Sequence, residues 1–150
     1  VTRRYLAVVH GAKIEDEGTI ETLYNRHPRQ RLKMSGKVEQ GKRACTHWRT
    51  LARSRGFALV ECRLETGRTH QIRVHMAHIG CPLLGDPVYG NKRGNLLATS
   101  DNGRELKDFR RQALHAAILG FEHPVTGEML RFETVLPKDM QRLEKFLERL

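Results

Sequence analysis

A run of side chains that can bind anions or bases follows a glycine near the middle of this sequence. Its five members are Arg68, Thr69, His70, Gln71 and Arg73. The preceding residue, Gly67, permits the backbone to approach a ligand closely, and the N–H groups that open a following helix favour negative charge. A ligand that carries a phosphate or a carboxylate is therefore expected at this turn.

Two elements are expected to position that run. Alternation predicts a strand before it, with an apolar face made of Ala58, Val60, Cys62 and Leu64. A helix is predicted from Thr69, its expected cap, to Ile79, with Gly80 ending it. The apolar side of this helix comprises Ile72, Met76 and Ile79. Arg68 would then lie where the strand ends and the helix begins, a place where sheets often position chemistry.

The remaining pattern is mostly that of strands. Apolar or β-rich runs lie at residues 5–10, 19–24, 44–52, 57–65, 112–120 and 128–136. The runs at 44–52 and 57–65 should pair around a turn at 54–56. Residues 26–41 read as a basic loop that orders only on binding a partner, and residues 91–104 read as a surface loop. Pro137 is expected to open a last helix. Many strands with few helices predict an α+β fold on a mixed or antiparallel sheet.

The positive charge of the chain is local. The formal net charge is +10, and ten lysine and arginine residues lie between Arg26 and Arg55 with one acid, Glu39. A local surplus of positive charge favours a polyanionic partner. RNA is a better candidate than a membrane surface, because the cations lie on short interrupted segments. No apolar run approaches the roughly 18 residues of a membrane span. Three scattered cysteines argue against a disulfide framework and for a reducing cytoplasm.

Several motifs together resemble one family, the RluA-type pseudouridine synthases, which isomerise uridine in RNA. Residues 63–75 are similar to its arginine motif and residues 4–9 (RYLAVV) to its tyrosine motif. Further matching segments are residues 80–90 (GCPLLGDPVYG), 111–116 and 123–128. The stretches RHPRQRLKM and GKRACTHWR resemble the RluD-like branch, which acts on large-subunit ribosomal RNA.

The resemblance implies a role for each candidate site residue. Arg68 would pair with a nucleophilic aspartate, and Tyr5 would stack on the uracil and serve as a candidate for proton transfer at C5. Leu114 would form an apolar wall. The residues expected to contact substrate or the aspartate loop are Thr69, His70, Gln71 and Arg73. On pattern alone, Tyr5 and Leu114 also fit core positions, and Arg68 also fits a surface ion pair.

One part of the family pattern has no counterpart in this sequence. The family's nucleophile lies in a His-Arg-Leu-Asp type segment upstream of the tyrosine motif, and the sequence contains no such segment. We expect residues 1–150 to be the C-terminal portion of a catalytic domain, inactive alone. A non-catalytic RNA-binding module is the alternative. Asp86, before a proline, is expected to be a turn residue, while Glu61 and Glu65 are expected to face solvent.

Ligand expectations follow from the same residues. A zinc site could be suggested by four potential ligands, which are His70, His75, His78 and Cys81. At their spacing these side chains would not lie on one face of a helix, so no metal site is predicted. The family mechanism implies no cofactor. The cations predicted to bind the RNA backbone are Arg26, Arg29, Arg31, Lys33, Lys37, Lys42 and Arg43. A cytoplasmic monomer with an RNA partner is expected.

Overall fold

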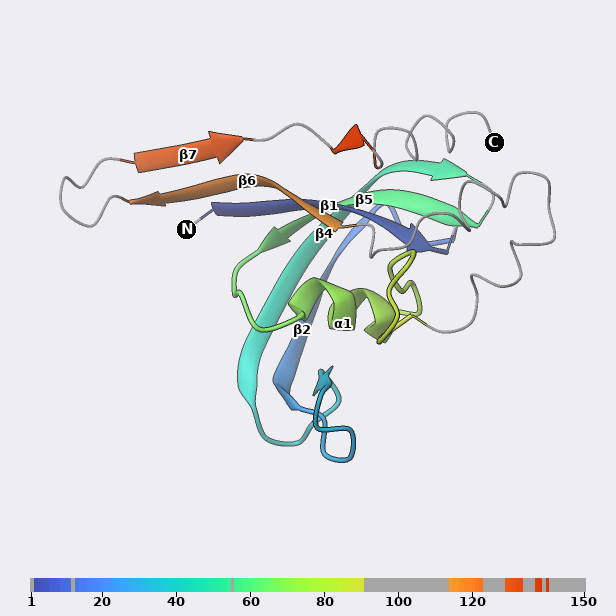
Figure 1. Ribbon diagram of the computed structural model, residues 1–150, viewed down its shortest axis with the longest axis vertical. Helices are drawn as coiled ribbons and strands as arrows, with labels where there is room; N and C mark the ends of the chain where they lie inside the picture. The colour runs from blue at the N-terminus through green and yellow to red at the C-terminus, as the bar shows by residue number, and fades with distance from the viewer. Residues whose placement is uncertain are drawn as a thin grey trace.

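A seven-stranded antiparallel sheet forms the body of the described chain (Figure 1). The computed structural model describes residues 2–11, 13–54, 56–90, 114–122, 129–133, 137, 138 and 140. The strands are β1 (Thr2–His10), β2 (Glu17–Arg26), β3 (Met34–Ser35), β4 (Lys42–Ser54), β5 (Phe57–Leu64), β6 (Leu114–Glu122) and β7 (Met129–Glu133). Their order is β3-β2-β4-β5-β1-β6-β7, and every neighbouring pair is antiparallel. The expected α+β class and the pairing of β4 with β5 are confirmed.

The apolar face predicted for β5 forms the main core. Its residues Ala58, Val60 and Cys62 pack with Ala7 and Val9 of the neighbouring strand β1. This core lies against the helix α1 (Gln71–His78), which contributes Ile72 and Met76. Met76 is fully buried, and burial of a methionine side chain contributes about 1.5–3 kcal/mol. The predicted apolar side of the helix is therefore confirmed.

The start of α1 differs from the expectation. Thr69 does not cap the helix; the N-cap residue is His70, which makes no side-chain capping hydrogen bond. The backbone of His70 is left-handed, with φ of 57°. A non-glycine residue there costs about 1–2 kcal/mol, so tertiary contacts must hold it. Gly80, at φ of 79°, ends the helix as predicted.

The second face of β5 is also covered. Phe57 and Leu59 are buried there, and Glu61 is only 9% exposed. The expectation that Glu61 faces solvent is therefore wrong. Its carboxylate lies 3.2 Å from Arg4 Nε and 4.0 Å from Arg49 Nη2, so it is a buried acid paired with cations. The matching expectation for Glu65 is confirmed, because Glu65 is exposed.

The basic segment forms more regular structure than expected. β2 continues to Arg26, and β3 pairs with it in the register Asn25↔Ser35 and Arg26↔Met34. β2 and β4 extend beyond the rest of the sheet and carry β3 at their far end (Figure 1). The predicted loop at 91–104 lies outside the described residues, as does most of the last helix. No helix in the described ranges is long and apolar enough to cross a membrane.

Candidate functional site

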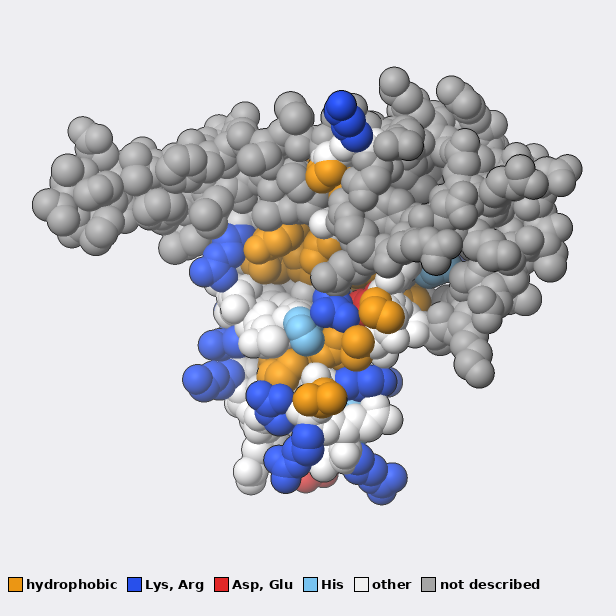
Figure 2. Space-filling view, viewed as in Figure 1, with side chains coloured by type: hydrophobic (Ala, Val, Ile, Leu, Met, Phe, Trp, Pro, Cys, Tyr) orange, Lys and Arg blue, Asp and Glu red, His pale blue; other side chains and the backbone are white. Residues whose placement is uncertain are grey.

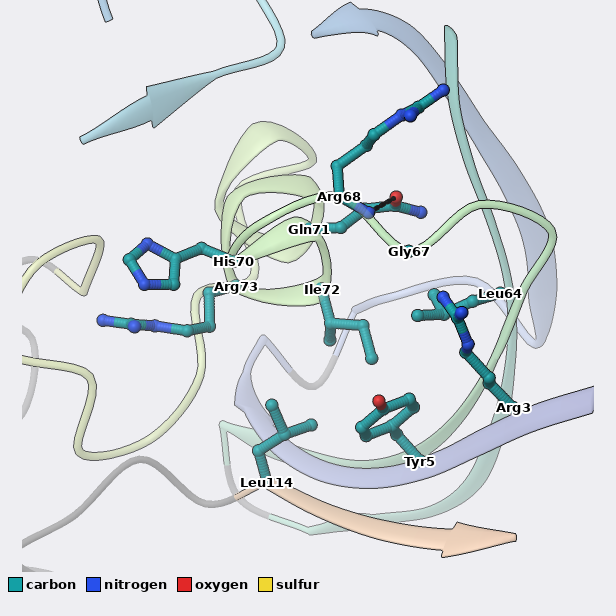
Figure 3. Close-up of a pocket in the computed structure, with 10 residues that line it drawn as sticks. All are labelled: Arg3, Tyr5, Leu64, Gly67, Arg68, His70, Gln71, Ile72, Arg73 and Leu114. Carbon is teal, nitrogen blue, oxygen red and sulfur yellow. Dashed lines mark hydrogen bonds between the residues drawn. The ribbon is translucent and has the colours of Figure 1, made fainter. Parts of the chain in front are cut away.

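A cavity of about 350 Å³ opens where β1, the start of β6 and the β5–α1 turn converge (Figure 3). Its lining residues are Arg3, Tyr5, Leu64, Gly67, Arg68, His70, Gln71, Ile72, Arg73 and Leu114. The fold thus brings together six of the seven catalytic and substrate residues predicted from the sequence. The exception is Thr69, which does not line this cavity.

Tyr5 forms the floor of the cavity. Its strand β1 lies between β5 and β6, where Tyr5 is opposite Cys62 on one side and Ala116 on the other. Figure 3 shows the ring between Leu114 and Arg3, below Ile72. The half-buried ring packs against the main core. An aromatic face held in this way can stack on a planar base, and such stacking stabilises a bound base by about 1–3 kcal/mol.

Arg68 is held at the turn but points away from Tyr5 (Figure 3). Its Nε donates to the Arg43 carbonyl oxygen at 3.0 Å. Its backbone N–H donates to Gln71 Oε1, also at 3.0 Å. Both contacts fix the position of the turn. The two terminal nitrogens of the guanidinium form no hydrogen bond or ion pair with the described residues. The pairing of Arg68 with an aspartate stays a prediction.

Arg3 is a cation of the cavity that the sequence reasoning missed. Its guanidinium lies against Gly67, where a Cβ would collide with it. Among the described residues it has no ion pair. Side chains two positions apart share one face of a strand, so the spacing of Arg3 and Tyr5 was the signal that could have found it. Arg3 therefore adds a positive charge beside the tyrosine ring.

Gln71 has no hydrogen-bonding capacity left for RNA. It is 2% exposed, and its Oε1 accepts from Thr66 Oγ1 at 2.7 Å and from the Arg68 N–H. Its Nε2 donates to the Cys45 carbonyl oxygen at 3.0 Å and to Thr46 Oγ1 at 2.9 Å. Four such bonds saturate an amide side chain. The geometry contradicts the predicted RNA contact: Gln71 instead positions the Arg68 turn.

His70 and Arg73 belong to one network with Asp86 and Tyr89. Arg73 forms two hydrogen bonds of 2.8 and 2.9 Å to Asp86, and its guanidinium carbon lies 5.0 Å from the centre of the Tyr89 ring. His70 Nδ1 is 2.9 Å from the Tyr89 hydroxyl, which also accepts from the Met34 N–H. Burial opposes ionisation of Asp86, but bonds from Arg73 and backbone N–H groups outweigh it and lower its pKa.

The turn role predicted for Asp86 is confirmed. Its Oδ1 accepts from the backbone N–H groups of Val88 and Tyr89 at 2.9 and 3.1 Å. Tyr89 was not singled out by the sequence reasoning, because its contacts come from residues far away in the chain. Burial, followed by the nearby Arg73, lowers the pKa of His70. This shift favours the neutral form of the His70 ring, which Tyr89 holds in place.

Residues 1–78 match the family model described as RNA pseudouridylate synthase. The chain belongs to this family. Its tyrosine and arginine motifs, at residues 4–9 and 63–75, both fall inside the matched range.

Curated relatives agree with the family. The chain is 51% identical over 143 residues to the uncharacterized RNA pseudouridine synthase YlyB of Bacillus subtilis, covering 95% of this chain and 43% of that protein. It is 51% identical over 147 residues to ribosomal large subunit pseudouridine synthase D of Xanthomonas campestris, covering 95% of this chain and 43% of that protein. The chain thus spans less than half the length of these relatives.

Solved structures agree with the fold. Human RNA pseudouridylate synthase domain containing 1 has a TM-score of 0.69 and 25% identity, covering 97% of this chain and 65% of that one. Human RNA pseudouridylate synthase domain containing 4 has a TM-score of 0.70 and 22% identity, covering 98% of this chain and 62% of that one. The second likeness supports the fold alone.

His75, one of the histidines considered for zinc, is a core residue. It is fully buried, with Nε2 2.9 Å from Thr22 Oγ1 and Nδ1 2.8 Å from Thr46 Oγ1. Burial, followed by the nearby His78, lowers its pKa to about 4. Both ring nitrogens are therefore occupied by threonine hydroxyls, and the ring is neutral.

A separate group of three potential metal ligands lies on β4 and at the end of β5. Among the described residues these are Cys45, His47 and Glu65. Glu65 Oε2 is 2.8 Å from both Cys45 Sγ and His47 Nε2, and 3.3 Å from Arg43 Nη2. The bonds from Cys45 and then His47 lower the pKa of Glu65 to about 2. The carboxylate is thus already occupied by donors that include a guanidinium, which disfavours a metal cation.

The predicted RNA-binding cations differ in their availability. Figure 2 shows Lys and Arg side chains on the end of the molecule formed by β3 and the adjoining ends of β2 and β4. Arg26 Nη1 donates to the Arg31 carbonyl oxygen at 2.7 Å and so closes the turn. Arg43 is paired with Glu21 and Glu65, which leaves it less free to bind phosphate than the prediction supposed. Other predicted cations are exposed and form no ion pair with the described residues. They include Arg29, Arg31, Lys37 and Lys42.

Proposed function

We propose that this chain forms the base-binding part of an RNA pseudouridine synthase that acts on uridines of large-subunit ribosomal RNA. The observation that carries the proposal is the cavity in which Tyr5 forms the floor and Arg3, Arg68 and Leu114 form the walls. Support for the substrate class comes from the Xanthomonas relative, which is a ribosomal large subunit pseudouridine synthase. The exposed cations near β3 supply the attraction for an RNA backbone.

In the proposed reaction the target uridine leaves its stack and enters the cavity. Its uracil stacks on Tyr5, while Leu114 and Ile72 exclude water from the edge of the base. The bond from ribose C1′ to uracil N1 breaks, the freed uracil turns, and C1′ joins uracil C5. C5 must then lose its proton while N1 gains one, so the reaction is a net isomerisation, and we assign the Tyr5 hydroxyl to assist this proton transfer. The family reaction requires neither a metal ion nor an organic cofactor.

The proposal also needs a nucleophile for ribose. None of the described residues that line the cavity carries a carboxylate. Two cations, Arg3 and Arg68, border the cavity and could hold an aspartate ionised, because a nearby positive charge favours the charged form. We therefore propose that residues 1–150 act as the C-terminal portion of the catalytic domain, and that an aspartate from a segment outside these residues completes the site.

Release of tritium from uridine labelled at C5 tests this function. The full product of the gene, here called the full-length protein, is incubated with labelled large-subunit ribosomal RNA beside the isolated 150-residue chain. We expect release by the full-length protein and background release by the chain alone. Binding of RNA by the full-length protein without any release would favour a non-catalytic binding module. Release by the isolated chain would show that it contains its own nucleophile.

A further inference from the structure

A second cavity of about 440 Å³ adjoins the first at the β5–α1 turn. Gly67 and Arg68 line both cavities, so the turn is the wall between them. The other lining residues come from the β2–β3–β4 region and from the start of α1. They are Tyr24, Asn25, Met34, Gly41, Lys42 and Thr69. Thr69 therefore faces a neighbouring cavity and not the one that holds Tyr5.

The chemistry of this cavity suits a phosphate with its sugar and base. Lys42 and Arg68 are its two cations, and its lining contains no carboxylate. Within the described ranges neither cation has an ion-pair partner. Arg68 is the cation proposed above to hold the aspartate, so Lys42 is the charge that remains for a bound phosphate. The exposed Thr69 hydroxyl can hydrogen-bond a ribose or phosphate oxygen. The half-buried Met34 adds apolar surface against which a base can pack.

The walls of the second cavity are fixed before any ligand binds. The Tyr24 hydroxyl donates to the Thr69 carbonyl oxygen, which ties β2 to the start of α1. Tyr24 is only 3% exposed. A Cβ at Gly41 would collide with the backbone of Tyr24, so only glycine permits the chain to pass this close to β2. A preformed cavity loses little conformational entropy on binding.

We propose that the second cavity is a subsite for the nucleotide next to the target uridine, with Lys42 binding its phosphate. The proposal rests on the proposed function, because it takes the uridine to lie on Tyr5. Enzymes that flip a base also contact the nucleotides that flank it. Two cavities that share the Gly67–Arg68 wall place consecutive nucleotides on either side of an arginine.

Binding of a uridine-centred RNA trinucleotide to the full-length protein tests this subsite. The affinity is measured for three RNAs: the native trinucleotide and two versions that carry an uncharged methylphosphonate at one or the other linkage. Lys42→Gln removes a cation that belongs to the second cavity alone. Lys13→Gln, an exposed lysine in the β1–β2 connection, removes the same charge elsewhere and serves as the matched control. Circular dichroism confirms that each variant is folded.

We expect Lys42→Gln to weaken binding of the native trinucleotide about tenfold, the effect of losing one charge-assisted hydrogen bond. The log–log salt slope should shrink by about 0.7. At one linkage the methylphosphonate should cause a similar loss in the wild type and little further loss in Lys42→Gln. Lys13→Gln should bind like the wild type. Equal losses in the two lysine variants, or fully additive losses at both linkages, would overturn the subsite.

Tyr5→Leu separates this proposal from the proposed function. If both are correct, Tyr5→Leu weakens trinucleotide binding, and Lys42 remains coupled to one phosphate. Loss in Tyr5→Leu without any Lys42–phosphate coupling would overturn the subsite and leave the uridine site standing. Coupling without any loss in Tyr5→Leu would overturn the placement of the uridine on Tyr5, and with it the assignment of the second cavity to the adjoining nucleotide.

Discussion

The buried His75 predicts that the protein loses stability as the pH falls through the range from 6.5 to 4. Its folded pKa is about 4, against an ordinary value of 6.5. Between these values the unfolded state binds a proton that the folded state does not, so unfolding becomes more favourable as pH decreases. The full shift corresponds to about 3 kcal/mol, and about 2 kcal/mol should already be lost between pH 7.5 and pH 5.

The measurement is the free energy of unfolding in urea at pH 7.5, 6.5, 5.5 and 5.0. His75→Gln keeps a polar side chain between Thr22 and Thr46 but cannot titrate. The variant should be less stable at pH 7.5, and the difference from the wild type should shrink toward pH 5 as the wild type loses its advantage. The contribution of Glu65 falls in a separate window, because its stabilisation is lost only as pH decreases from about 4 toward 2. Parallel curves for wild type and variant from pH 7.5 to 5 would refute a neutral, buried His75.

Three further predictions concern the turn that separates the two cavities. Gln71→Leu removes four hydrogen bonds from a buried site and should lower the free energy of unfolding by about 2–4 kcal/mol. The control, Gln40→Leu at an exposed position, should change it little. Equal effects of the two variants in urea denaturation would contradict the positioning role of Gln71. His70→Gly and His70→Ala both delete the ring, but only alanine keeps a Cβ at φ of 57°. The glycine variant should therefore be the more stable by about 1 kcal/mol. An alanine variant of equal stability would argue against the left-handed backbone. In the full-length protein Arg68→Lys keeps the charge but loses the planar fork. Turnover should therefore fall about a hundredfold with little change in melting temperature. A large fall in melting temperature together with the loss of turnover would make Arg68 a structural residue.

The sequence predicted the elements that have a strong local pattern. The alternation in β5 and the apolar side of α1 are visible within single segments, and both are confirmed. The N-terminal boundary of the helix was wrong because Thr69 has the type of a cap, whereas the backbone of His70 turns left-handed under contacts from Tyr89, nineteen residues away. Local sequence carries no sign of that contact.

Residues of the candidate site could be predicted where the signal lies within one segment of the sequence. Tyr5 and Arg68 were found through motifs, and the period of a strand would have added Arg3. Gln71 was assigned to the substrate or the aspartate loop through the family resemblance, but its partners Cys45 and Thr46 reach it from another strand. Glu61 was assigned to solvent because alternation was taken to mean a one-sided sheet. These errors share one cause, since burial depends on tertiary packing that segment patterns do not encode.

The central claim, that the cavity above Tyr5 holds the target uridine, is tested most directly by the turnover of Tyr5→Leu. The full-length protein and this variant are compared by tritium release from C5-labelled large-subunit ribosomal RNA, with melting temperatures measured on the same samples. Leucine keeps an apolar side chain in the core but removes both the stacking face and the phenol. We predict at least a hundredfold loss of release, since general acid–base assistance alone contributes about 10²–10⁴-fold, with a nearly unchanged melting temperature. Turnover within a few-fold of wild type would contradict the claim.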